Sequence, residues 1–135
     1  MKVITFGTFD LFHIGHLKIL QRANAMGTHL TVGISSDTFN LRKKNKLSII
    51  PQADRIEIVS NIVGVDTVFV EESMELKRQY LIDHQADILV MGDDWKGRFD
   101  EFQDLCKVVY LKRTEDVSTS YLLDYIISGP TRCIQ

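Results

Sequence analysis

The chain has 135 residues, of which 16 are lysine or arginine and 18 are aspartate or glutamate, so its formal charge is −2. This near balance excludes a general nucleic-acid binder, which carries a strong excess of basic residues. No apolar run approaches the roughly 20 residues that span a bilayer, and the N-terminus lacks a signal-peptide layout, so we expect a cytoplasmic protein that does not contact membranes. The length fits one domain over residues 1–135, and Cys106 and Cys133 are too few for a disulfide framework.

Short apolar runs of strand length alternate with segments of helical periodicity along the chain. The first run, Val3–Phe6, leads into a polar turn and then into the amphipathic segment Leu17–Met26, which ends at Gly27. The second run, Leu30–Ile34, is followed by the basic run Arg42–Lys46. The later elements are a helix over Gln52–Ile62, a strand over Thr67–Val70, a helix over Met74–His84 with Leu76, Tyr80 and Leu81 facing inward, strands over Ile88–Met91 and Val108–Leu111, and a helix over Thr119–Ile127.

This alternation predicts an α/β fold. Nearly every residue of the predicted strands is apolar, as in strands that are buried on both faces. The expected architecture is therefore a parallel sheet with helices on each side.

Polar residues gather directly after three of the predicted strands. They lie in the segments Thr8–His16, Gly92–Gly97 and Arg113–Ser120. Ligands of open parallel sheets bind outside the carboxyl ends of the strands, so we expect these segments to meet at one crevice.

The first segment places His13 and His16 around Gly15 at a strand-to-helix junction. Backbone N–H groups and the positive end of the helix dipole favour phosphate there, and imidazoles add donors for a phosphoryl oxygen. A glycine would let a polyphosphate approach the backbone. The competing interpretation is a metal site in which both histidines join Asp10, although no cluster of further histidines supports it.

The third segment supplies the Arg113 guanidinium and then three hydroxyls, at Ser118, Thr119 and Ser120. One of these hydroxyls is explained by an ordinary helix N-cap. Three in a row exceed what a cap needs, and with Arg113 they form a candidate clamp for the β- and γ-phosphates of a nucleotide.

The basic run and the aspartates leave several interpretations open. Arg42–Lys46 is either a solvated loop, the usual fate of a charge run, or a segment that folds over the crevice and neutralises a second phosphate. Lys77 and Arg78 either reach the same region or lie on a helix surface. Asp93 and Asp94 fit a divalent cation, a histidine partner or a substrate hydroxyl.

Motifs of several other families are absent from the sequence. It contains neither Gly-x-x-x-x-Gly-Lys-Ser/Thr nor Gly-x-Gly-x-x-Gly, which argues against a P-loop NTPase and a standard dinucleotide dehydrogenase. It also lacks a Gly-x-Ser-x-Gly elbow, so no nucleophile for covalent catalysis stands out.

Taken together, these segments resemble the cytidylyltransferase family. His13-Ile14-Gly15-His16, inside Gly-Thr-Phe-Asp-x-x-His-x-Gly-His, is similar to the signature of the wider nucleotidyltransferase superfamily. Arg113–Ser120 resembles the second signature of its cytidylyltransferase branch, and Met91–Trp95 resembles the bacterial glycerol-3-phosphate cytidylyltransferases. The resemblance covers nearly the whole chain. It implies a Rossmann-like, doubly wound parallel sheet, a homodimer, and transfer of a cytidylyl group from CTP to a phosphorylated alcohol.

The resemblance also implies roles for individual residues. His13 and His16 would stabilise the transition state, with Arg113, Ser118 and Thr119 as further catalytic residues. CTP would be bound by Thr8, Phe9, His13, Ile14, Gly15, His16, Asp94, Arg113, Thr114, Ser118, Thr119 and Ser120, with Mg²⁺ accompanying the nucleotide and no metal held by the protein alone. The acceptor phosphate would be bound by Lys43, Lys44, Lys46 and Lys77.

Departures from the family pattern leave the acceptor open. Ile62-Val63-Gly64 offers no arginine before Val65-Asp66, and Asp116 stands where a glycine is common. Glycerol 3-phosphate, which would yield CDP-glycerol for a cell-surface polymer, is the leading acceptor. Glycerol 2-phosphate, another polyol phosphate and an amine-bearing phosphate are alternatives, as are adenylyl transfer and a non-catalytic nucleotide-binding module.

Overall fold

The computed structural model describes residues 1–114 and 117–129. Cys133 and Asp116 lie outside the described residues. Cys106 is free and buried. Among the described helices, none is both long and apolar enough to cross a membrane.

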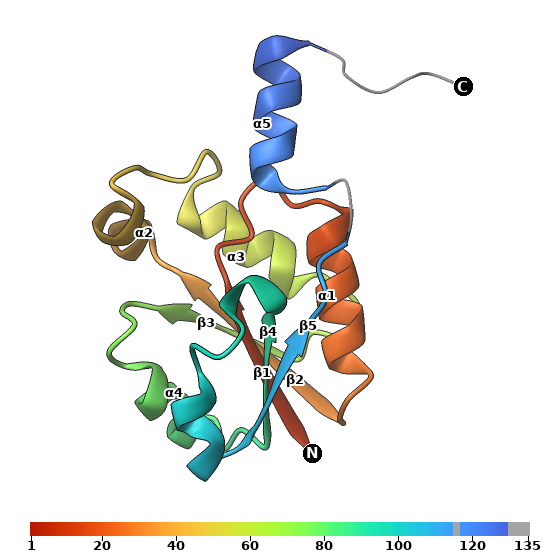
Figure 1. The fold of residues 1–135 in the computed structure, drawn as a ribbon, viewed down its shortest axis with the longest axis vertical. Coiled ribbons are helices and arrows are strands. Elements are labelled where there is room, and N and C mark those ends of the chain that lie inside the picture. The colour runs from red at the N-terminus through yellow and green to blue at the C-terminus, as the bar shows by residue number, and fades with distance from the viewer. Residues whose placement is uncertain (115–116, 130–135) are drawn as a thin grey trace.

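Five parallel strands form the sheet at the centre of the fold (Figure 1). They pair in the order β3-β2-β1-β4-β5, so β1 lies between β2 and β4. The order reverses direction between β1 and β4, which is where ligands bind in doubly wound sheets. The strands are β1 (Lys2–Gly7), β2 (His29–Ser35), β3 (Thr67–Glu71), β4 (Ile88–Gly92) and β5 (Lys107–Leu111).

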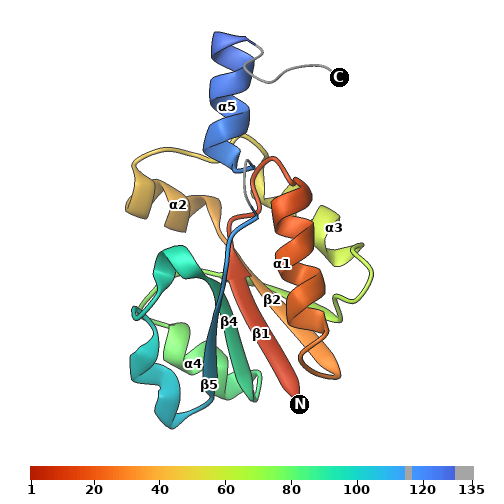
Figure 2. The same ribbon diagram turned by 45° about the vertical axis from the view of Figure 1, so that its right-hand side comes forward.

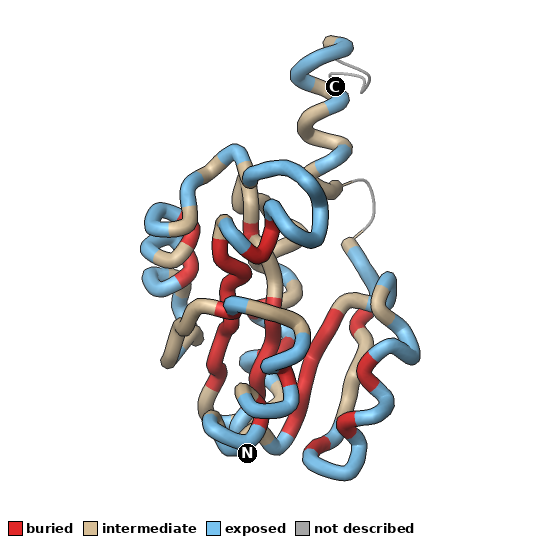
Figure 3. The backbone as a smooth tube through the Cα atoms, turned by 90° about the vertical axis from the view of Figure 1, so that its left-hand side faces the viewer, coloured by how far each residue is buried: buried red, intermediate tan, exposed pale blue. Residues whose placement is uncertain are grey.

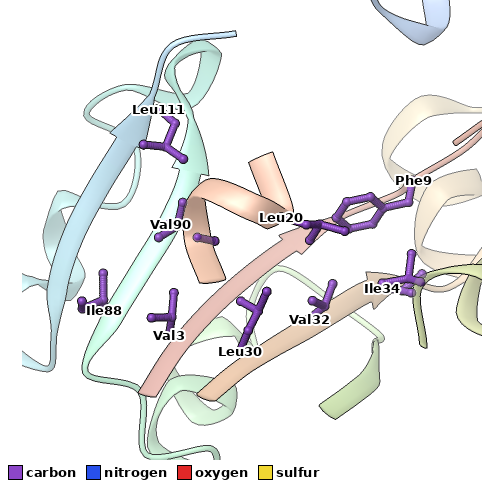
Figure 4. Packing of buried hydrophobic residues seen from close by; sticks show 11 residues of the cluster. Val3, Phe9, Leu20, Leu30, Val32, Ile34, Ile88, Val90 and Leu111 are labelled. Carbon is purple, nitrogen blue, oxygen red and sulfur yellow. The ribbon is translucent and has the colours of Figure 1, made fainter. Parts of the chain in front are cut away.

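Helices cover both faces of this sheet (Figure 2). On one face, α1 (Ile14–Asn24) and α3 (Gln52–Ser60) pack Leu20, Ala23 and Val59 against alternate strand residues. Figure 4 labels Leu20 of this cluster together with Val3, Leu30 and Val32 of the strands. On the other face, α4 (Lys77–Asp83) and the short 3₁₀ helix η2 (Asp100–Asp104) close a second core. Buried residues run along the strands (Figure 3), so the predicted α/β fold with a doubly wound parallel sheet is confirmed.

Four features of the fold differ from the sequence prediction. Helix α1 begins at Ile14, three residues before the predicted start. The basic run is partly helical: α2 (Asp37–Lys44) starts at a Ser36 cap and ends with basic residues, which suit the negative end of the helix dipole. Helix α4 begins at Lys77, three residues after the predicted start, and buries Lys77 with Leu81. Leu76, which was predicted to face inward, is its N-cap and is exposed. The connection from β4 to β5, for which no helix was predicted, contains η2 and a further 3₁₀ helix, η1 (Asp93–Trp95).

Helix α5 (Thr119–Ser128) stands beyond the carboxyl edge of the sheet (Figures 1 and 2). It contains no buried residue, and Ile126 and Ile127 are largely exposed. Its N-terminal part reaches the crevice: Thr119 bonds to the turn that follows β1, and the cavity lining extends along α5 as far as Leu123.

Candidate functional site

A cavity of about 920 Å³ opens at the carboxyl ends of β1, β4 and β5. All three polar segments that follow predicted strands contribute to its lining, as expected for the edge of a parallel sheet. Of the predicted CTP ligands, Ile14 alone is absent from the lining, since it is about half exposed on α1. The lining includes Thr8, Phe9, His13, Gly15, His16, Asp94, Arg113, Thr114, Ser118, Thr119 and Ser120.

His13 and His16 together cap helix α1. His13 has an extended backbone, and its Nδ1 accepts the N–H of Gly15 at 3.0 Å. His16 reaches back, and its Nδ1 accepts the N–H of His13 at 3.2 Å. This is a capping box in which imidazoles replace the usual Ser/Thr and Glu/Gln, and it explains the early start of α1. A Cβ on Gly15 would lie 2.9 Å from the His13 ring, so the folded-back histidine requires glycine there.

The caps determine which nitrogen of each ring carries a hydrogen. Since both Nδ1 atoms accept backbone N–H groups, a neutral ring must be protonated at Nε2. Burial, and then the charge of Arg113, lowers the pKa of His13. Burial, and then His13, lowers the pKa of His16 to about 4, against an opposing effect of Asp10. At neutral pH each ring therefore has one Nε2–H donor for an anion in the cavity.

The turn between β1 and α1 is conformationally strained and held by aromatic rings. Phe9 and Leu11 have φ values of 56° and 49°, in the left-handed region that side chains disfavour. The buried Phe9 ring lies 5.3 Å from the His16 ring, and Phe12 lies 5.4 Å from it on centroid distances. Packing of these rings therefore fixes both the turn and the orientation of His16.

Two of the three hydroxyls at the start of α5 already have structural partners. Ser118 is the N-cap, and its Oγ accepts the N–H of Tyr121 at 2.9 Å, so the capping interpretation is confirmed for this residue. Thr119 Oγ1 donates to the backbone carbonyl of Asp10 at 3.0 Å. Ser118 keeps its hydroxyl hydrogen for a ligand, whereas Thr119 can offer only an acceptor.

Asp10 joins the same turn to the segment that follows α2. Its carboxylate accepts the N–H groups of Ile49 and Ile50 at 2.9 and 2.8 Å. These bonds give both oxygens of the alternative metal site a structural role. Within residues 1–114 and 117–129, no group of three or more His, Cys, Asp or Glu side chains is placed to hold a metal ion.

The predicted acceptor lysines divide into two groups. Lys44 and Lys46 line the cavity, and Lys44 Nζ donates to Thr8 Oγ1 at 3.3 Å. Lys43 and Lys77 do not belong to the lining. Lys43 is exposed on α2, with its Nζ 4.4 Å from the centre of the Phe39 ring.

Lys77 forms an internal ion pair. It is 2% exposed, and its Nζ lies 2.8 Å from Glu71 Oε2. The same Nζ lies 3.9 Å from the centre of the Phe6 ring and 4.9 Å from that of Phe99. Burial lowers the pKa of Lys77, and Glu71 opposes that shift. This position gives Lys77 a structural partner in the second core.

Arg55 is the main residue of the site region that sequence reasoning missed. It is fully buried and donates to the carbonyls of Thr8, Ser35 and Ile50 and to the carboxylate of Asp37, at 2.7 to 2.9 Å. It thereby ties the ends of β1 and β2 to α2 and to the cavity wall. Its spacing from Val59 and Ile62 was a usable signal, because it places a charge on the apolar stripe of a predicted helix.

Comparison with known proteins decides the family. The family model described as cytidylyltransferase-like matches residues 4–127. The chain belongs to this family. Its relatives include the glycerol-3-phosphate cytidylyltransferase of Bacillus subtilis, 50% identical over 93% of this chain and 96% of that protein. The Staphylococcus aureus protein of the same name is 43% identical over 88% of this chain and 89% of its own.

Solved structures support the fold that the family implies. A lipopolysaccharide core biosynthesis protein from Thermoplasma volcanium superposes with a TM-score of 0.76 at 24% identity, covering 85% of this chain and 98% of that one. At this identity the likeness concerns the fold alone. The cytidylyltransferase-like membership therefore rests on sequence, and the shared architecture agrees with it.

Proposed function

We propose that this protein transfers a cytidylyl group from CTP to a phosphorylated alcohol, with glycerol 3-phosphate as the leading acceptor, and releases CDP-glycerol and pyrophosphate. The observation that carries the proposal is the neutral His13 and His16 pair on the wall of a cavity at the sheet edge. The choice of nucleotide and acceptor follows the names of the relatives in Bacillus subtilis and Staphylococcus aureus.

In the proposed reaction, an oxygen of the acceptor phosphate attacks the α-phosphorus of CTP in line. A new P–O bond forms as the bond to the β-phosphate oxygen breaks, and pyrophosphate leaves with the electron pair. No protein nucleophile takes part. The chain contributes positioning and charge stabilisation, for which preorganised donors are the effective devices.

The donors toward the nucleotide would come from two sides of the cavity. The Nε2–H groups of His13 and His16 would bind phosphoryl oxygens as negative charge shifts to the leaving group. Arg113 would add a permanent cation, and the Ser118 hydroxyl would add a hydrogen. Thr8, Phe9, Gly15, Asp94, Thr114, Thr119 and Ser120 are proposed as further CTP contacts because they line the same cavity.

The acceptor side would be formed by Lys44 and Lys46. Both line the cavity, and their charges suit an incoming phosphate. Loss of solvent around its ammonium group, followed by the charge of Lys46, lowers the pKa of Lys44. An anion placed between the two lysines would relieve this repulsion.

Mg²⁺ would enter with CTP and would not need a preformed protein site. This ion usually keeps several waters and binds through substrate phosphates. The described side chains fit that mode, since they place no set of three metal-binding groups together. Mg²⁺ would neutralise phosphate charge, whereas the histidines and Arg113 would orient the oxygens.

We further propose a homodimer, which sedimentation analysis can test.

An assay with purified protein tests the function. CTP, Mg²⁺ and glycerol 3-phosphate are expected to release pyrophosphate, ATP should not replace CTP, and His16→Ala should abolish turnover in a folded protein. Glycerol 2-phosphate, other polyol phosphates and amine-bearing phosphates serve as competing acceptors. A higher kcat/KM for one of these would reassign the acceptor. CTP binding without turnover on any acceptor would instead identify a nucleotide-binding module.

A further inference from the structure

Asn40 links two parts of the cavity wall without belonging to the wall itself. The residue lies on α2, is 0% exposed and is absent from the lining. Its Nδ2 donates to Ser48 Oγ at 3.0 Å, and its Oδ1 accepts from Thr8 Oγ1 at 3.4 Å. Thr8 and Ser48 both line the cavity. One buried amide therefore joins the end of β1 to the segment that follows α2.

The direction of each hydrogen bond follows from what the groups can donate. Thr8 has one hydroxyl hydrogen and two lone pairs. The Lys44 ammonium can only donate, so Thr8 accepts it at 3.3 Å. Thr8 also lies 3.0 Å from Ser35 Oγ, which can donate into its second lone pair. The Thr8 hydrogen is then left for Asn40 Oδ1, so the one hydrogen and both lone pairs of the Thr8 hydroxyl are used.

We propose that Asn40 is a positioning residue for the acceptor side of the cavity. It orients the Thr8 hydroxyl so that its lone pair faces Lys44, and it holds Ser48 and the lysine-bearing segment against β1. The proposed acceptor role of Lys44 comes from the function argued above, and this inference rests on it. Without the Asn40 amide, the Thr8 hydroxyl and the Lys44 ammonium that bonds to it would have no defined orientation.

The test compares Asn40→Leu with a matched control. Leucine has a similar size but makes neither hydrogen bond, so it removes the link and retains the packing volume. The control, Val59→Ala, removes a fully buried side chain of α3 that does not line the cavity. It should cost stability and leave both KM values unchanged. Ser48→Ala removes the bond to Asn40 together with one hydroxyl of the cavity lining, and it serves if Asn40→Leu does not fold.

The expected result is that the KM for the acceptor rises more than the KM for CTP. Loss of the link should raise the KM for glycerol 3-phosphate about tenfold and the KM for CTP less than about threefold. The smaller effect on CTP is expected because, among the described residues, Thr8 is the one proposed CTP contact that forms a hydrogen bond with Asn40, whereas the cap of α1 holds His13 and His16. Equal changes in both KM values, or the same larger rise in the acceptor KM in Val59→Ala, would overturn the proposal.

A double-mutant cycle tests whether Asn40 acts through Lys44. Lys44→Met should weaken binding of the acceptor. Adding Asn40→Leu should then have little further effect, because the ammonium group that Asn40 positions is gone. Additive losses would overturn the proposal. The cycle can also be run on the affinity for inorganic phosphate, measured by calorimetry. A coupled loss of phosphate affinity without turnover in the parent protein would contradict the proposed function and leave the role of Asn40 supported.

Discussion

At the scale of single residues, His13 and His16 serve two purposes with different atoms. Their Nδ1 atoms cap α1, and their Nε2–H groups remain for a ligand. The cap orients the rings, and the same bonds select the tautomer. Structure and proposed catalysis are therefore separable, because a side chain can replace the Nδ1 acceptor without replacing the Nε2 donor.

Substitutions at His16 should separate these purposes. Glutamate is a standard residue at this position of a capping box, so His16→Glu should keep α1 and a native melting temperature. Its negative charge would face the nucleotide phosphates, and kcat should fall by about 10²–10³ or more. His16→Gln keeps both an acceptor and an N–H donor and should retain more activity. Steady-state kinetics, circular dichroism and the control His29→Gln check this, and near-native turnover by His16→Glu would contradict the mechanism.

At the scale of elements, two short helices account for most of the difference between expectation and structure. Periodicity predicted α1, α3 and α5 because their apolar residues recur on one face. Helix α2 has only Phe39 and Asn40 buried, so its pattern was too weak to be distinguished from a charged loop. In α4 the inward position belongs to Lys77, whose partner Glu71 lies on a different element. Such a pairing has no signal in local sequence.

The ion pair between β3 and α4 predicts a specific effect on stability. Lys77→Met would leave the Glu71 carboxylate buried without a counter-charge, which should lower the free energy of unfolding by about 3–5 kcal/mol. The double variant Lys77→Met/Glu71→Gln should recover much of this loss. Urea denaturation measures both, and the folded variants should keep the KM for the acceptor. A stable Lys77→Met with a raised acceptor KM would instead support the role as acceptor ligand.

At the scale of the whole molecule, the sheet order brings distant segments together. β1 lies beside β4, and β4 beside β5, so turns that are about a hundred residues apart in sequence meet at one edge. Arg55 and Asp10 then attach the segment after α2 to that edge. The cavity therefore forms only when the chain folds, and protonation of its histidines is coupled to folding.

The folding free energy should depend on pH through His16. Its pKa of about 4 in the folded state lies below the ordinary value of 6.5, so the unfolded chain binds more protons between these values. The contribution of His16 to the free energy of unfolding should be fully present above pH 6.5 and should be lost as the pH falls toward 4. The loss should be about 2 kcal/mol, because solvent around the partly exposed ring screens part of the effect. Denaturation of the parent protein and His16→Gln over this range measures the difference. The same pH dependence of the free energy of unfolding in both proteins would contradict the lowered pKa of His16.

The sequence by itself determined the order of the five strands and of α1, α3, α4 and α5 along the chain, the parallel sheet, the three converging segments and the family, because each depends on local periodicity or on a contiguous motif. Tertiary structure decided which lysines face the cavity, what Asn40 and Arg55 hold in place, and which atoms of His13 and His16 stay available. These depend on partners from other elements, such as Glu71 for Lys77 and Thr8 for Lys44. A charged side chain has the same local pattern whether it binds a ligand or an internal partner, and only packing in space distinguishes the two.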